Sequence, residues 1–250
     1  MIFKKEVWIT PYALTRTLHI YVPDMAQHCD ERYPVLYMYD GHNLFDDAEA
    51  TYGKSWGLKD YLDRTKEKLI VIGIECNHEG NQRLVEYSPY TFNDRHLGLI
   101  EGSGKQLMEW VVNELKTLID QELPTKPDRY NTWIGGSSMG GLMSLYTITH
   151  HNATFSKAAC LSPFLYPIRD EIAKECLRPL DSATSIYLSW GSNEARSKRT
   201  FAYMSKTNLE MANLLNRQPI RLHLNLVVGG QHNEACWEKE IPLFMKFLKG

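Results

Sequence analysis

The sequence predicts an α/β protein: a mostly parallel central sheet with an antiparallel N-terminal edge and helices on both faces. Stretches typical of strands alternate with stretches typical of helices, and this alternation implies parallel pairing. Residues 69–74 form a continuous apolar run, as expected of a strand buried on both faces. The first strands have no helix between them, which favours an antiparallel edge. The chain has 250 residues, so we expect a single domain over residues 1–250.

The elements are expected in the following order. Strand periodicity first appears at residues 15–22 and returns at residues 34–39, which end at Asp40-Gly41. Residues 105–122 have helical spacing, and residues 130–134 form a strand that leads into a glycine-rich turn and a helix over 140–150. The irregular stretch 77–103 is long for a connection, so it is expected to wall or cover a site. The other expected strands are 157–161, 185–190 and 220–228, and the other expected helices are 55–64, 200–216 and 234–249.

Composition excludes several classes of partner. The formal net charge is -2 and the basic residues are scattered, so neither nucleic acid nor an anionic membrane is expected as a partner. The start lacks the apolar stretch of a signal peptide, and no apolar segment approaches the ~20 residues that span a bilayer. We therefore expect a cytoplasmic protein with reduced, mostly buried thiols; its five widely spaced cysteines are Cys29, Cys76, Cys160, Cys176 and Cys236.

The most informative motif is Gly136-Ser137-Ser138-Met139-Gly140. A strand-like stretch precedes it and a helix-like stretch follows, which is the context of a nucleophile elbow. Such a turn lifts a serine hydroxyl clear of the backbone, and a side chain at Gly136 or Gly140 would crowd it. This context predicts that Ser138 is the nucleophile of a serine hydrolase.

The ends of other expected strands carry the remaining residues that a catalytic site needs. Sites of open α/β sheets lie at the carboxyl ends of the strands, where Asp40-Gly41-His42, Ser138, Glu194 and His232 are expected. The order serine, acid, histidine is one in which hydrolases carry a catalytic triad. A histidine can take the serine proton and return it to the leaving group, and a carboxylate fixes the histidine tautomer. We expect these roles for His232 and Glu194, with Asp181 as a weaker alternative acid.

The oxyanion formed during acyl transfer needs two backbone N–H donors. The expected donors are Met139, directly after the nucleophile, and His42, in the turn after the Asp40 strand. Only the backbone of His42 is required for this role, and Asp40 can be structural because Asp-Gly is a strong turn signal.

Two other types of site are not supported. Residues 98–105 resemble a phosphate-binding loop, but Leu99 stands where its first glycine is required and Gln106 where Ser or Thr would hold magnesium. The nine histidines are dispersed, and the adjacent His150 and His151 lie on different helix faces. We therefore expect no metal and no cofactor.

These residues resemble the putative esterase family of the α/β-hydrolase fold. The family includes esterase D (S-formylglutathione hydrolase), feruloyl and acetylxylan esterases, enterochelin esterases and mycolyltransferases. The resemblance covers nearly the whole chain. It is carried by residues 39–45, 83–89, 135–142, 188–194 and 229–232.

The resemblance implies Ser138 as nucleophile, His232 as base, Glu194 as acid, and backbone donors at Met139 and His42. Trp56, Tyr87 and Trp190 are expected either to wall the substrate pocket or to pack in the core. The expected activity is that of a serine carboxylesterase on small acyl or aryl esters. Siderophore-ester, carbohydrate-ester or thioester hydrolysis and acyl transfer are the alternatives, and a homo-oligomer is left open. A non-catalytic binding protein is the alternative of another class, although both serine and histidine are present.

Overall fold

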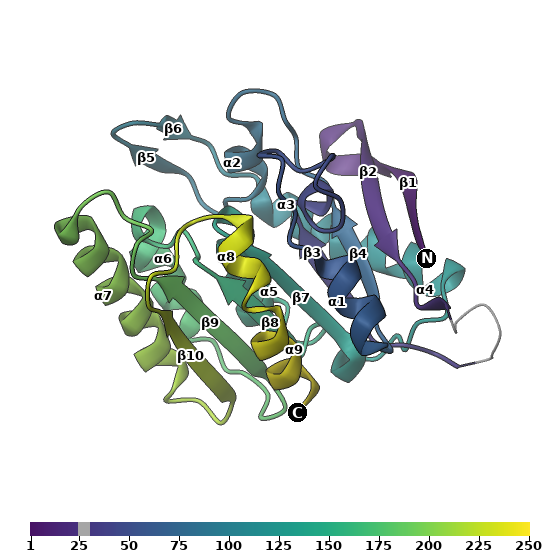
Figure 1. Cartoon of the computed structure of the whole chain (residues 1–250). Coiled ribbons are helices and arrows are strands. Elements are labelled where there is room, and N and C mark those ends of the chain that lie inside the picture. Colours follow the sequence, from purple (N-terminus) through teal and green to yellow (C-terminus); the bar gives the residue numbers. More distant parts are fainter. Residues whose placement is uncertain (25–30) are drawn as a thin grey trace.

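The computed structural model describes residues 1–24 and 31–250, and Cys29 lies outside them. Its central sheet has eight strands in the order β1-β2-β4-β3-β7-β8-β9-β10 (Figure 1). The strands are β1 Ile2–Ile9, β2 Leu14–Tyr21, β3 Val35–Tyr39, β4 Ile70–Ile74, β7 Thr132–Ser137, β8 Lys157–Leu161, β9 Ser185–Gly191 and β10 Arg221–Val227. The helices are α1 Leu58–Thr65, α2 Gln82–Glu86, α3 Gly104–Trp110, α4 Lys116–Glu122, α5 Met139–His150, α6 Arg169–Cys176, α7 Lys198–Leu215, α8 Glu234–Glu238 and α9 Ile241–Lys249.

The expected fold class is confirmed by the strand pairing. All neighbours from β4 to β10 are parallel. The pairs β1–β2 and β2–β4 are antiparallel and form the N-terminal edge. The sequence pattern did not identify β1 itself, because Lys4, Lys5 and Glu6 interrupt its apolar residues. Charged side chains are common on such edge strands.

Two apolar cores cover the two faces of the sheet. One core packs the helical stretch 104–122 and helices α5, α6 and α7 against the sheet. The other packs α1, α8 and α9 on the opposite face, in front of the sheet in Figure 1. The short β3 and β4 strands are buried at every position, as expected for parallel strands with helices on both sides.

Three expected elements differ in detail. The helix expected over residues 105–122 contains a π-helical turn, Val111–Leu115, between α3 and α4. The helix expected over residues 234–249 is two helices, because α9 begins anew at Ile241 with Pro242 in its first turn. The stretch 77–103 contains α2 and a hairpin of β5 Phe92–Asp94 and β6 Gly98–Ile100, and α6 was not expected.

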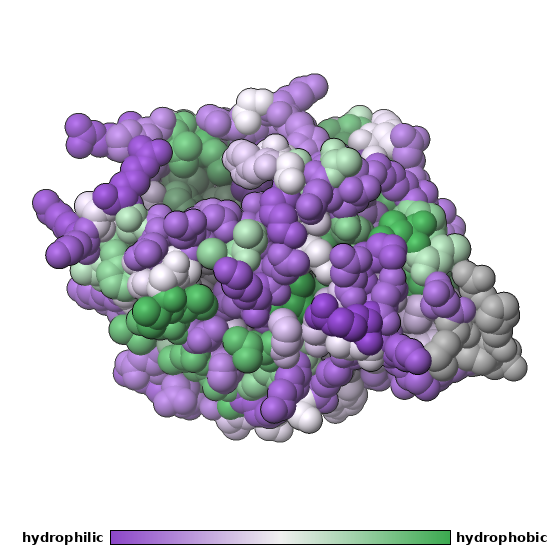
Figure 2. Space-filling view, viewed as in Figure 1, coloured by the Kyte–Doolittle hydropathy of each residue, from purple (hydrophilic) through white to green (hydrophobic). Residues whose placement is uncertain are grey.

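The surface mixes polar and apolar side chains, with apolar residues showing over α7 and β10 (Figure 2). The sheet ends at β10, whose Leu224 and Leu226 are exposed. Within residues 1–24 and 31–250, no helix combines the length and the apolarity needed to cross a bilayer. The four cysteines in these ranges are free, and Cys76, Cys160 and Cys176 are buried, as expected.

Candidate active site

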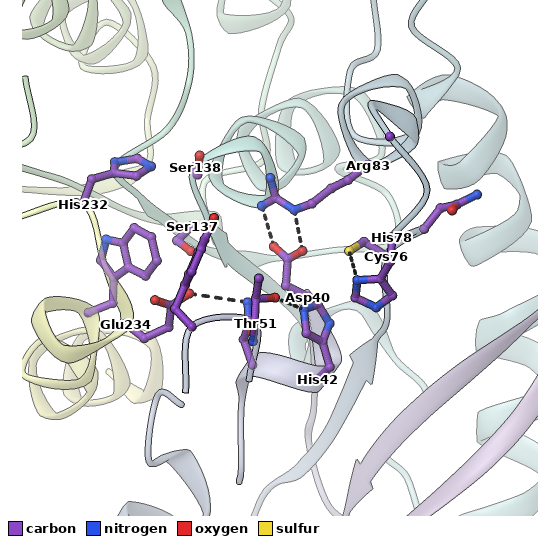
Figure 3. Close-up of a pocket in the computed structure, with 15 residues that line it drawn as sticks. Asp40, His42, Thr51, Cys76, His78, Arg83, Ser137, Ser138, His232 and Glu234 are labelled. Carbon is purple, nitrogen blue, oxygen red and sulfur yellow. Dashed lines mark hydrogen bonds and ion pairs between the residues drawn. The ribbon is translucent and has the colours of Figure 1, made fainter. Parts of the chain in front are cut away.

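A pocket of ≈ 370 Å³ lies at the carboxyl edge of the parallel sheet. Ser138, from the turn after β7, and His232, from the loop after β10, both line it (Figure 3). Strand register explains this convergence, because Ser137 pairs with Leu161, Leu161 with Ser189 and Gly191 with Val227, so β7 and β10 end at the same edge. Asn77, His78, Gly80 and Arg83 form part of the wall, as expected for the stretch 77–103.

Ser138 occupies a strained turn between β7 and α5. Its φ of 57° and ψ of -118° are rare for a residue with a side chain, and strain of this kind is typical of a nucleophile elbow. Its N–H donates to Leu161 O at 3.0 Å, and its carbonyl accepts from Leu142 N at 3.0 Å. A Cβ at Gly136 would lie 3.0 Å from Gly140 C, so a side chain there crowds the turn and requires the backbone of α5 to shift by a few tenths of an ångström. The crowding expected from the sequence is therefore present.

Glu194 and His232 are joined by a hydrogen bond. His232 Nδ1 lies 3.2 Å from Glu194 Oε2, and the Glu194 side chain is only 2% exposed. The other carboxylate oxygen accepts from Ser162 Oγ and from the N–H of Gly191, both at 2.5 Å. The Trp237 indole N–H donates to Ser162 Oγ at 2.9 Å. This network holds the carboxylate in place, which in turn fixes the orientation of the imidazole.

Ser138 and His232 share the pocket without a hydrogen bond between their side chains in the described structure. The histidine side chain is 34% exposed and packs edge-on against Trp237, with ring centroids 5.1 Å apart. In ligand-free sites catalytic hydrogen bonds are often long and tighten only when substrate binds.

Met139 and His42, the expected oxyanion donors, lie directly after Ser138 and in the wall of its pocket, respectively. Met139 is the first residue of α5, so its N–H has no acceptor four residues back in the helix. His42 lies in a short 3₁₀ helix, Gly41–Asn43, directly after β3, and lines the pocket. The His42 side chain is buried. Burial lowers the pKa of its imidazole to about 4, so the ring is neutral at pH 7.

Asp40 and Arg83 form a two-point ion pair at the pocket wall (Figure 3). Arg83 Nε and Nη2 donate to the two Asp40 oxygens at 2.6 and 2.7 Å. Asp40 has a left-handed backbone with φ 57°, and its carbonyl accepts from Asn43 N. Burial raises the pKa of the Asp40 carboxyl, but the charge and hydrogen bonds of Arg83 outweigh burial and lower the pKa overall. The pair thus anchors the turn that carries His42 to the segment after β4.

The aromatic residues suggested as pocket walls lie in the interior. Trp56 packs against Trp237, with ring centroids 5.8 Å apart. Tyr87 is fully buried, and its hydroxyl accepts from Asp40 N and donates to Ile74 O. Trp190 is buried and donates to Ser205 Oγ. None of the three lines the pocket, so all three pack in the core, which was the second of the two expectations.

The alternative acid, Asp181, lies at the wrong end of β9. It precedes the strand, pairs with Arg129 and caps the turn at Ala183, whereas Glu194 follows the strand. Seven strand residues span roughly 20 Å, which removes Asp181 from the pocket edge.

Sequence reasoning gave no role to two pocket residues, Arg83 and Glu234, or to Ser162, which lies behind Glu194. Arg83 lies in residues 83–89, one of the stretches that carry the family resemblance. The sequence therefore singled out this residue, but it did not indicate that Arg83 pairs with Asp40. Glu234 is buried at the start of α8, and burial raises its pKa. Ser162, which supports Glu194, has a left-handed φ of 46° that no sequence signal indicated.

Comparisons with known proteins agree with this geometry. Residues 14–246 match the family described as "Putative esterase". The chain is 23% identical over 244 residues to the uncharacterized protein YbbA of Bacillus subtilis (strain 168), covering 94% of this chain and 93% of YbbA.

Solved structures share the fold at low identity. An IroE-like serine hydrolase from Shewanella oneidensis has a TM-score of 0.78 and 16% identity, over 100% of this chain and 79% of that one. The siderophore hydrolase EstA from Aspergillus nidulans has a TM-score of 0.71 and 14% identity, over 98% of this chain and 94% of that one. With the family match over almost the whole chain, we conclude that this protein belongs to the putative esterase family, has the α/β-hydrolase fold, and is a hydrolase of carboxylic esters.

Proposed function

We propose that the protein is a serine carboxylesterase that hydrolyses small acyl or aryl esters through an acyl-enzyme on Ser138. The observation that carries this proposal is the Glu194–His232 hydrogen bond at 3.2 Å, beside a strained Ser138 in the same pocket. A buried carboxylate that holds an imidazole is the arrangement that makes a serine hydroxyl a nucleophile. A pocket of ≈ 370 Å³ is at the small end of ligand sites, which supports a small substrate.

The proposed reaction has two halves. Ser138 Oγ attacks the ester carbonyl while His232 takes its proton, and the N–H groups of His42 and Met139 hold the oxyanion. The imidazolium then gives the proton to the departing alcohol, which leaves Ser138 acylated. In the second half His232 takes a proton from water, the hydroxide oxygen attacks the acyl carbon, and the acid leaves as Ser138 recovers its proton.

A second candidate is the hydrolysis of siderophore esters. The structural neighbour EstA is named a siderophore hydrolase. Arg83 lines the pocket wall, and although its charge is paired with that of Asp40 it keeps N–H groups that can donate to an anionic or catecholate ligand. Hydrolysis of carbohydrate esters, hydrolysis of thioesters and acyl transfer to an alcohol would all proceed through the same acyl-enzyme. Activity measurements with each type of substrate distinguish these alternatives.

The test is pre-steady-state hydrolysis of nitrophenyl esters from acetate to decanoate, with feruloyl esters, acetylated sugars and a thioester as further substrates. Wild type is expected to release a burst of nitrophenol equal to the enzyme concentration, because acylation precedes a slower hydrolysis. Ser138→Ala should lose the burst and about 10³- to 10⁶-fold in kcat. Ser182→Ala, which changes an exposed serine, serves as the control and should keep both the burst and the kcat of wild type. Full turnover by Ser138→Ala would overturn the proposal.

A further inference from the structure

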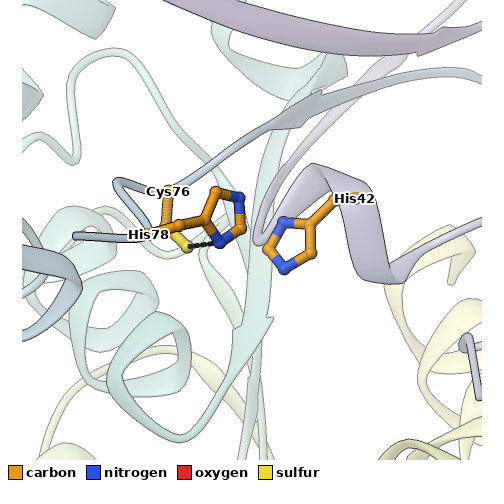
Figure 4. A group of neighbouring side chains, drawn as sticks. All are labelled: His42, Cys76 and His78. Atoms are coloured by element: carbon orange, nitrogen blue, oxygen red, sulfur yellow. Dashed lines mark hydrogen bonds between the residues drawn. The ribbon is translucent and has the colours of Figure 1, made fainter. Parts of the chain in front are cut away.

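Three side chains with metal-binding atoms meet at one wall of the pocket: His42, Cys76 and His78 (Figure 4). One ligand atom from each lies within 4.8 Å of the other two. Cys76 Sγ is 4.0 Å from His78 Nδ1, and the two imidazoles are 4.5 Å apart between ring centroids. His42 follows β3 and the other two follow β4, so pairing of these parallel strands brings the three together.

Both imidazoles are oriented by an oxygen on their outer side. His42 Nε2 is 2.9 Å from Thr51 Oγ1, and His78 Nε2 is 2.8 Å from Glu75 Oε1. Histidines that ligate metals usually make such a bond with the nitrogen that does not bind the ion. The bond leaves Nδ1 of each ring as the free nitrogen, and Nδ1 of His78 faces Cys76 Sγ.

His42 Nδ1 is a buried polar atom without a hydrogen-bond partner among the described residues. The residue is only 5% exposed, so solvent does not readily supply the missing partner. Buried polar atoms are nearly always satisfied, because leaving one unpaired destabilises the folded protein. An ion at the centre of the cluster would satisfy this atom.

We propose that His42, Cys76 and His78 bind a borderline-soft divalent cation such as Zn²⁺ at the wall of the esterase pocket. Two imidazole nitrogens and one thiolate suit Zn²⁺ or Co²⁺ rather than Mg²⁺ or Ca²⁺, which prefer oxygen. Burial and the nearby Asp40 carboxylate raise the pKa of the Cys76 thiol, so the ion must displace its proton, which passes to solvent as the sulfur binds the ion. The inference goes beyond the proposed esterase function and does not require it.

Metal binding requires the three ligand atoms to move slightly closer together. Tetrahedral zinc with bonds of ~2.0–2.3 Å places its ligand atoms roughly 3.3–3.8 Å apart. All three ligand atoms lie within 4.8 Å of one another, so the separations close by at most about 1.0–1.5 Å, and the His78 side chain, which is 52% exposed, has room for that movement. Nearby charges permit a cation, because Asp40 and Glu75 are carboxylates and Arg83 is paired with Asp40. Three protein ligands leave a fourth coordination position for water.

The ion would act on a residue of the proposed mechanism. His42 supplies a proposed oxyanion N–H, so a cation on its ring fixes the turn that carries this donor. That consequence rests on the proposed function, whereas binding itself is measured without substrate.

The test is titration of purified, metal-free protein with Co²⁺, followed by absorption and by competition with a chromogenic chelator. Wild type is expected to bind one equivalent and to show thiolate-to-cobalt charge-transfer absorption in the near ultraviolet, which a site without sulfur lacks. Cys76→Ser should lose that absorption, and His78→Ala should weaken binding more than ~100-fold. Thr51→Val, which removes an outer partner, should weaken it about 10- to 100-fold.

Two controls separate this site from surface binding and from catalysis. His96→Ala removes an exposed histidine of the same segment and should bind Co²⁺ like wild type. Ser138→Ala should also bind like wild type, so a failed esterase assignment leaves this result intact. The proposal is overturned if Co²⁺ binds without charge-transfer absorption, if His78→Ala binds as wild type does, or if stoichiometric binding is absent.

Discussion

At the scale of single residues, the site depends on backbone conformations that side chains rarely adopt. Asp40, Ser138 and Ser162 all have positive φ, and all three lie directly after a strand of the sheet. Such strain costs about 1–3 kcal/mol for each residue and persists where surrounding contacts enforce it. Here Arg83 holds Asp40, helix α5 holds Ser138, and Glu194 and Trp237 hold Ser162. Strain is thus concentrated around the proposed reacting groups.

The first residue-scale prediction concerns Glu194. Glu194→Gln keeps the shape but replaces one acceptor oxygen with a donor, so the amide cannot accept from His232, Ser162 and Gly191 together. We expect kcat for nitrophenyl acetate to fall roughly 10²- to 10⁴-fold, by misorientation of the imidazole. The exposed Glu101→Gln is the matched control. If Glu194→Gln turns over as wild type does, the acid of the triad lies elsewhere.

The second residue-scale prediction concerns the Asp40–Arg83 pair and pH. The folded-state pKa of Asp40 is lowered below its unfolded value of about 3.9, so the pair adds stability that is fully present above that pH. The contribution is lost as pH falls through the folded-state pKa. Asp40→Asn should therefore lower the free energy of unfolding by about 2–4 kcal/mol at pH 7, and this deficit should shrink below about pH 4.

Urea denaturation from pH 7 to pH 3 measures this deficit. The exposed Asp60→Asn is the control and should change stability by less than about 0.5 kcal/mol throughout. A deficit for Asp40→Asn that stays constant with pH would show that the ion pair is not its cause.

At the scale of elements, the unit β7–turn–α5 determines where the nucleophile lies. A Cβ at Gly140 would come 2.8 Å from Tyr39 Cβ, so α5 approaches β3 closely only with glycine there. We expect Gly140→Ala to destabilise the protein by about 1–3 kcal/mol, because the clash outweighs the ~1 kcal/mol gain in helix propensity. The displaced elbow should also lower kcat at temperatures where the variant is fully folded.

Thermal denaturation and ester hydrolysis measured together test this prediction. Gly98→Ala is the control: its φ of 74° strains an alanine, but a Cβ there meets open space. The Gly98→Ala variant should be somewhat less stable than wild type and have the same kcat. Equal kcat for Gly140→Ala and wild type would mean that the elbow tolerates displacement of α5.

Elements could be predicted from the sequence where periodicity and flanking residues agree. Lys157–Leu161 was predicted to its exact bounds, and β9 and α5 to within one residue. The π-helical turn at Val111–Leu115 could not be predicted, because apolar spacing continues across it, whereas the break before Ile241 coincides with Pro242, a signal that the expectation of one helix passed over. The β5–β6 hairpin has strands of three residues, too short to leave a periodic signal.

At the scale of the whole molecule, parallel pairing gathers distant residues at one edge of the sheet. Asp40, Ser138, Glu194 and His232 were predicted to lie at strand ends, and three of them line one pocket while Glu194 contacts the third, His232. Motifs and chain order sufficed for this prediction, because strand ends of a parallel sheet share an edge.

Partners across the sheet could not be predicted. The Arg83–Asp40 pair, the support of Glu194 by Ser162, and the meeting of His42 with Cys76 and His78 each join segments from different strand ends. The interior placement of Trp56, Tyr87 and Trp190 also depends on which face each side chain occupies. Those relationships require the register of β3 against β4 and of β8 against β9.

The most direct test of the central claim is to react the protein with a fluorophosphonate probe and map the modified residue by mass spectrometry. The account predicts one adduct on Ser138, no labelling of Ser138→Ala, and much slower labelling of His232→Ala. An adduct on another residue, or equal labelling of Ser138→Ala and wild type, would contradict it.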